Sequence, residues 1–227
     1  MEKHYFRYAM PFIFLLLPFL LNAQKDFTGL NNAEFNLNFE KDSLWSFDFE
    51  VGNRNILYYK EEFDFEALHI EITHITQYKL GDKFKVGGGF RYYTKHLFNT
   101  SKQDELRIVQ QVSYKKKKNA VSFKHRLRFT QRYRERITLR TRYRYGVAFP
   151  LNNQTTKNPL LLSIQTEAVH EFGKYEKPSL GQRLTSEISF QIFKETELSL
   201  GLEYRYRDYT NHPYTQLYFL SGASISL

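Results

Sequence analysis

The dominant pattern along the chain is a strict alternation of apolar and polar residues with a period of two. It first appears at residues 33–39, where every second residue is Ala, Phe or Leu, and it returns at residues 45–51. Alternation of this kind is typical of a β-strand with one apolar and one polar face. The polar residues 41–43 between the two runs predict a tight turn, so the first two strands are expected to form a hairpin.

The same alternation continues to the C-terminus and predicts about eleven strands, most of them about ten residues or longer. Transmembrane strands need about 9–11 residues, whereas strands of soluble proteins usually have about 5–6. An antiparallel meander of this size is expected to close into a barrel, because closure removes the unpaired edges. Further alternating segments lie near residues 69–73, 84–92, 106–114, 123–129, 136–149, 187–192, 198–206 and 217–227.

Parity and connection lengths refine this expectation. Single-chain bacterial barrels have even strand numbers, short periplasmic turns and longer external loops. We therefore predict a single antiparallel up-and-down transmembrane β-barrel of about twelve strands, with ten as the alternative; twelve requires a short strand within residues 24–30. Longer loops are expected at residues 53–64, 95–104, 173–181 and 208–213.

The N-terminal segment has the three parts of a secretory signal. Lys3 and Arg7 give a positive start, an apolar run follows at residues 9–21, and the small residue Ala23 marks a cleavage site. The run is shorter than the about 20 residues of a spanning helix. We expect residues 1–23 to be a signal peptide and residues 24–227 an outer-membrane β-barrel domain of a Gram-negative bacterium; an N-terminal anchor helix is the alternative.

Composition agrees with a barrel in a membrane. Aromatic residues make up 17% of the chain, and those near strand ends are expected to form girdles at the membrane interfaces. The chain has no Cys, so no disulfide can stabilise it. The net charge of +9 and the aromatic content would suit nucleic-acid binding, but the export signal argues against a nucleic-acid partner. A secreted, soluble, lipocalin-like binding barrel shows the same alternation and is an alternative.

The polar face carries the densest chemistry. If the apolar face contacts lipid, the polar residues line the lumen. Paired Arg and Glu side chains would fill it through charge-assisted hydrogen bonds and make a structural plug, whereas unpaired arginines would make a narrow, anion-favouring pore. The predicted lumen-lining charged network comprises Arg107, Arg126, Arg128, Arg136, Arg140, Arg142, Arg144, Glu167, Glu187, Glu203 and Arg205.

The sequence offers little for catalysis. Four His lie in predicted strands, and none forms a recognisable active-site signature with a nearby Ser. There is no metal-ligand spacing and no nucleotide-binding fingerprint, so we expect no catalytic residue, no metal and no cofactor. The glycines at 87–89 lie inside a strand and indicate a bend or a close approach. The expected partners are outer-membrane lipid, the barrel-assembly machinery and small anionic solutes; an outer-membrane lipid-acting enzyme is the alternative.

Several short segments resemble a known family. They are Leu44–Phe47, Asp104–Gln111, Lys124–Tyr133 and Arg140–Tyr145. In these the chain resembles the domain of unknown function 2490 family over nearly its whole mature length. The resemblance implies an outer-membrane protein and brings no established activity. Thr130 departs from the pattern, because the resemblance implies an acidic residue there, and the departure leaves one Arg without an adjacent partner on its strand.

Overall fold

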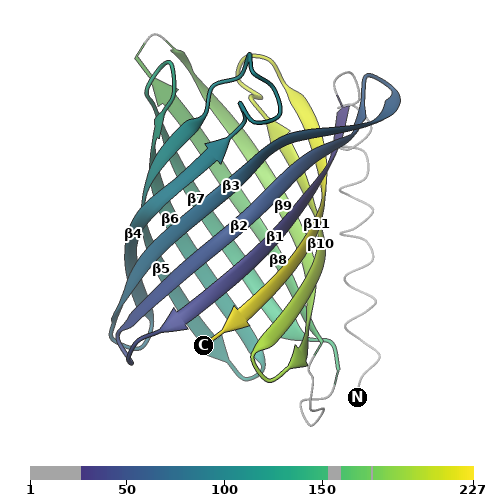
Figure 1. The fold of residues 1–227 in the computed structure, drawn as a ribbon. Helices are drawn as coiled ribbons and strands as arrows, with labels where there is room; N and C mark the ends of the chain where they lie inside the picture. The colour runs from purple at the N-terminus through teal and green to yellow at the C-terminus, as the bar shows by residue number, and fades with distance from the viewer. Residues whose placement is uncertain (1–26, 153–159, 175) are drawn as a thin grey trace.

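In a computed structural model the described residues form a closed barrel of eleven β-strands (Figure 1). The structure describes residues 27–152, 160–174 and 176–227. The predicted all-β barrel is thereby confirmed, while the predicted signal peptide at residues 1–23 lies outside the described residues. The strands are β1 (Phe27–Glu40), β2 (Trp45–Tyr59), β3 (Glu62–Leu80), β4 (Phe84–Thr94), β5 (Glu105–Lys118), β6 (Val121–Tyr133), β7 (Thr138–Pro150), β8 (Leu161–Gly173), β9 (Glu176–Phe193), β10 (Thr196–Arg207) and β11 (Tyr214–Ser226).

The way the barrel closes corrects the predicted strand number. Consecutive strands pair antiparallel, and β1 pairs with β11 in parallel. In an up-and-down meander the first and last strands point the same way when the strand number is odd, so the closing pair has to be parallel. The prediction of about twelve strands, or ten, was therefore wrong, since eleven close the barrel. Residues 27–30 lengthen β1 and do not form a separate strand; residues 24–26 lie outside the described residues.

The described strands are long, from 11 residues in β4 to 19 in β3. This range meets or exceeds the about 9–11 residues that a tilted strand needs to cross a bilayer. Within the described ranges, no helix is long and apolar enough to cross a membrane.

Two connections are much shorter than the sequence indicated. The loop predicted at residues 53–64 is a turn at Lys60 and Glu61, which have φ values of 50° and 66°. Positive φ at both central residues belongs to the type I′ hairpin turn, whose twist suits the flanking strands. Because neither residue is Gly or Asn, this turn could not be recognised from the residue types. Likewise, β9 already begins at Glu176, within the loop predicted at residues 173–181.

The two faces of the barrel differ in polarity. Large apolar side chains stand exposed on the outside, among them Phe49 at 47%, Leu127 at 51% and Leu200 at 60%. The buried inner side chains are mostly polar or charged, such as Glu105 at 1% and Arg128 at 6%. An apolar exterior around a polar interior is the arrangement of a transmembrane β-barrel. It contradicts the lipocalin-like alternative, because a soluble barrel turns its apolar face inward.

Candidate functional site: the charged interior

A polar cavity of about 560 Å³ lies inside the barrel. Its lining reaches from Lys95, just after β4, to Glu197, near the start of β10. These two positions lie at opposite ends of the barrel. β10 starts at the end where the C-terminal residues lie, whereas β4 ends at the other end, where the 95–104 loop begins. The lining contains twelve arginines and one lysine against six glutamates. The cavity therefore runs along much of the barrel and has a cationic lining.

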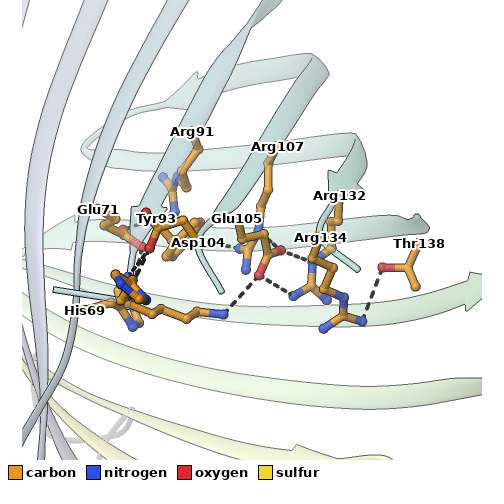
Figure 2. A network of polar contacts seen from close by, with 12 residues as sticks. His69, Glu71, Arg91, Tyr93, Asp104, Glu105, Arg107, Arg132, Arg134 and Thr138 are labelled. Carbon is orange, nitrogen blue, oxygen red and sulfur yellow. Dashed lines mark hydrogen bonds and ion pairs between the residues drawn. The ribbon is translucent and has the colours of Figure 1, made fainter. Parts of the chain in front are cut away.

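One carboxylate anchors the charged network near the 95–104 loop. Figure 2 shows Glu105 of β5 surrounded by donors. Its carboxylate accepts hydrogen bonds from Arg107 Nε and Arg132 Nε, both at 2.6 Å, and from Lys95 Nζ at 3.2 Å. The Glu105 side chain has no exposed surface. A buried charge is tolerated only when partners of this kind compensate it.

Glu171 of β8 extends this network to the next strands. Arg132 and Arg140 both donate to it, with Arg140 Nε at 2.8 Å, and the hydroxyl of Thr138 donates at 3.2 Å. Arg134 completes the set at 3.3 Å. At this level the side chains of β5 to β8 are linked by paired charges, so this section of the lumen has the character of a plug.

The middle of the barrel is charged differently. Glu167 of β8 lies 2.8 Å from Arg144, 3.4 Å from Arg183, and 3.7 Å from both Arg126 and Arg142. One carboxylate thus serves four guanidinium groups. In this section of the lumen the ion pairs with Glu167 leave a large excess of positive charge uncompensated.

An acidic group lies on the opposite wall, on β1 to β3. Glu34, Glu50 and Glu71 bring carboxylate oxygens within 4.8 Å of one another. Gly52 stands between Glu34 and Glu71 in the register, and its missing side chain lets them approach. Arg91 pairs with Glu50 at 2.9 Å and with Glu71 at 3.2 Å. Carboxylates could serve as metal ligands, but here Arg91 already supplies the positive charge.

Among the described residues, two guanidinium groups lie within 4 Å of the centre of an aromatic ring. Arg205 lies 3.7 Å from the ring centre of Tyr218, and Arg107 lies 3.8 Å from that of Tyr93. Cation–π contact of this kind attracts the guanidinium to the ring face without consuming its hydrogen-bond donors. Arg205 also donates to Glu203. These rings therefore fix the planes of cationic side chains that line the cavity.

Ten of the eleven residues predicted for the network belong to the barrel interior. Nine line the cavity directly, and Glu167 pairs with the lining arginines from behind. Arg136 is the exception: it is exposed in the connection between β6 and β7. The alternating segment was expected to begin at residue 136, two residues too early, because β7 begins only at Thr138.

The sequence reasoning missed several members of the network. The most heavily paired are Glu71, Arg91, Glu105, Arg132, Glu171 and Arg183. Glu71 and Arg91 lie on the polar face of alternating segments, so their inward orientation was available from the pattern, whereas the other four lie outside the segments in which alternation was recognised. Their pairing depends on the register between strands, which one sequence does not reveal.

The 95–104 loop is fastened to the barrel by Asp104. Its carboxylate accepts hydrogen bonds from the Tyr92 hydroxyl at 2.6 Å and from the backbone N–H groups of Lys95 at 2.8 Å and His96 at 3.0 Å. These donors favour the ionised form, so the hydrogen bond from Tyr92, followed by that from the His96 N–H, holds the pKa of Asp104 below its usual range.

We expect the hydrogen bonds that Asp104 accepts to be lost in acid. Because the folded pKa of Asp104 is depressed, its contribution is fully present above the unfolded pKa of about 3.9 and is lost as the pH falls through the folded value. Amide hydrogen exchange should show that the protection of the Lys95 and His96 N–H groups decreases once the pH drops below about 3.9. In Asp104→Asn the protection should not change with pH; an equal acid loss in that variant would contradict the prediction.

Comparison with known proteins places the chain in a family. A family described as "Protein of unknown function (DUF2490)" matches residues 27–216. Among solved structures, the barrel is similar to the anion-selective porin from Comamonas acidovorans, with 12% identity and a TM-score of 0.35. That match covers 79% of this chain and 55% of the porin, so the chain spans about half the porin's length. No curated protein matches the sequence. Since the family match covers most of the chain, this protein belongs to the DUF2490 family of unknown function.

Proposed function

We propose that the chain is a non-enzymatic outer-membrane β-barrel protein that forms a narrow pore favouring anions. The observation that carries the proposal is the composition of the cavity lining, with twelve arginines and one lysine against six glutamates. A narrow passage whose lining carries an excess of one sign of charge concentrates ions of the opposite sign and repels those of the same sign. The small anionic solutes that would cross it are the proposed substrates.

The outer surface supports the proposed location. Aromatic rings pack in pairs at both ends of the barrel: Trp45 with Tyr78 at 4.8 Å at one end, and Tyr58 with Phe63 at 5.3 Å at the other. Amphipathic aromatic side chains prefer the two membrane–water interfaces. An apolar belt between two aromatic rims fits a bilayer, so outer-membrane lipid and the assembly machinery for such barrels are the proposed partners.

The cavity volume shows that side chains do not fill the lumen completely, which supports a pore over a purely structural plug. About 560 Å³ greatly exceeds the about 30 Å³ that one water molecule occupies in the liquid. The paired charges around Glu105 and Glu171 nevertheless narrow the lumen near the 95–104 loop. The pore is therefore expected to pass small hydrated ions and to exclude larger solutes.

Single-channel recording in a planar bilayer tests the pore. We expect small, steady current steps, and in a KCl gradient a reversal potential displaced toward that of Cl⁻. Arg140→Ala combined with Arg142→Ala should move the reversal potential toward zero, because both residues line the cavity. Lys60→Ala, in an exposed turn, removes one positive charge outside the lumen and should leave the reversal potential unchanged.

Folding and location have to be checked alongside the current. A barrel in the outer-membrane fraction should change its mobility on a denaturing gel when it is boiled. Protein that shows this shift but stays silent in the bilayer would refute the pore and leave a structural role. Protein found only in a soluble fraction, without the shift, would refute the membrane location.

The lipid-acting enzyme has less support. His74 and His125 face the outside, where His74 contacts Thr76 at 3.1 Å and His125 contacts the Tyr143 hydroxyl at 2.8 Å. Within the part of the chain that the structure describes, no serine hydroxyl hydrogen-bonds to a histidine ring. Phospholipid hydrolysis by the purified barrel that disappears in His125→Ala would contradict the non-enzymatic proposal.

A further inference from the structure

The strongest unexplained feature of the lumen is a square of arginines on β6 and β7. In the register of these strands Arg126 lies opposite Arg144, and Arg128 lies opposite Arg142. Directly opposite residues on one face of a sheet have Cβ atoms about 4.5–5.5 Å apart, and like charges in such pairs are destabilising. Two such pairs in successive rows concentrate four positive charges on one small patch of wall.

The charges in this arginine square are poorly balanced by the protein. Glu167 is the one carboxylate within ion-pair distance of any of its members in the described residues, and it is shared with Arg183. Arg128 has no carboxylate within that distance there; its Nε and Nη2 both donate to the amide oxygen of Gln111, at 2.9 and 2.6 Å.

Burial makes this imbalance costly. Arg128 is 6% exposed and Arg142 is 9% exposed, so little of either side chain reaches solvent. The Nε of Arg142 is buried and makes no hydrogen bond within the described chain. Buried charges and donors normally find partners, because leaving them without one destabilises the fold. All four side chains also border the cavity, which gives a solute access to them.

From these observations we propose that the arginine square is a binding site for a small oxyanion of the phosphate or sulfate class. Several oxygens on one tetrahedral centre can each accept from a guanidinium fork on a different strand and match its bidentate geometry, whereas a single chloride offers one spherical acceptor. Such an anion would accept hydrogen bonds from donors now poorly used and would offset the repulsion across both pairs. The inference rests on the proposed function in one respect, that the anion must reach the lumen.

The test is calorimetric titration of the purified barrel in detergent with inorganic phosphate, at constant ionic strength in a gluconate background. We expect saturable binding, and a Kd about tenfold weaker or more in Arg128→Gln, as expected for losing charge-assisted hydrogen bonds. Arg128→Lys, which keeps the charge but loses the fork, should fall between the two. Arg207→Gln removes a cavity charge on β10, away from the square, and should leave the Kd within about twofold.

The outcomes separate a site from general electrostatic attraction. Equal weakening in Arg128→Gln and Arg207→Gln would overturn the proposal, as would displacement of phosphate by an equal concentration of chloride. Absence of binding to heat-modifiable wild-type protein would overturn it too. Titration with glycerol 3-phosphate in place of phosphate distinguishes the source, since binding of the ester identifies phosphorylated solutes as ligands and its exclusion identifies the free ion.

The same measurements keep this inference separate from the pore. A barrel that binds phosphate in detergent but carries no current would support the site and refute the pore. A barrel that conducts anions but binds no phosphate would support the pore and refute the site. In a conducting barrel the site also predicts that millimolar phosphate reduces the chloride current, and that Arg128→Gln removes this block.

Discussion

Glu167→Gln is expected to lower the free energy of unfolding by about 3–5 kcal/mol, the range found when one partner of a buried ion pair is removed. The Glu167 side chain is 3% exposed and lies within 4 Å of four arginines. The substitution keeps the shape of the side chain and removes its charge. The arginines around it would then lack a nearby negative charge, in an interior where their repulsion is weakly screened.

Glu187→Gln is the matched control. Glu187 also lines the cavity, but it has no ion-pair partner within 4 Å among the described residues. Its substitution should therefore change the free energy of unfolding far less. Urea unfolding in detergent micelles, followed by the fluorescence of Trp45, measures both; equal losses in the two variants would contradict the role given to Glu167.

Adding phosphate provides a second test of the Glu167→Gln variant. A ligand that binds only the folded state stabilises it by RT ln(1 + L/Kd), where L is the free ligand concentration, so the gain increases with the ligand concentration. If an oxyanion binds the arginine square, phosphate should restore part of the stability that Glu167→Gln loses, because the added negative charge lies beside the arginines that lost their carboxylate partner. Glu187→Gln should gain no more from phosphate than the wild-type protein gains.

The sequence predicted the kind of fold and the polar lining because both depend on alternation alone. Ala33 to Phe39 and the arginines at 126 and 128 show which side chains share a face, whatever strand lies beside them. Strand number depends instead on turns and closure. The Lys60–Glu61 turn carries no Gly or Asn signal, and the parallel pairing of β1 with β11 leaves no mark in either strand.

The ion-pair and hydrogen-bond partners within the charged network could not be predicted from the sequence for a related reason. Thr130 replaces the expected acidic residue, and one Arg was therefore expected to lack an adjacent partner on its strand. Arg140 of β7 lies opposite Thr130. In the structure Arg140 finds Glu171 on β8, while Arg128 finds Gln111 on β5. The Thr130 hydroxyl itself is buried without a partner in the described chain. The charge of each arginine is balanced or hydrogen-bonded by a residue on another strand, so the pairing depends on strand register and not on the local sequence pattern.

Two of the three glycines at 87–89, Gly87 and Gly89, confirm the close approach that their position in a strand predicted. A Cβ at Gly89 would overlap the carbonyl oxygen of His74 and lie 2.8 Å from the Cα of Ile75 on β3. Both obstacles are backbone atoms, so no side-chain movement relieves the clash. A Cβ at Gly88 would meet its nearest atom, the carbonyl oxygen of Val109, at 3.6 Å, an ordinary contact.

Adjacent alanine substitutions should therefore have opposite effects. Gly89→Ala should lower the free energy of unfolding by about 1–3 kcal/mol or more, as overpacking does when the backbone has to shift. Gly88→Ala should raise it by about 0.4–1 kcal/mol, because alanine fits that position and restricts the unfolded chain. Neither glycine has a positive φ, so backbone strain does not contribute. Denaturant midpoints at equal m-values measure the difference; equal shifts in both variants would show that β3 and β4 are not packed so closely at Gly89.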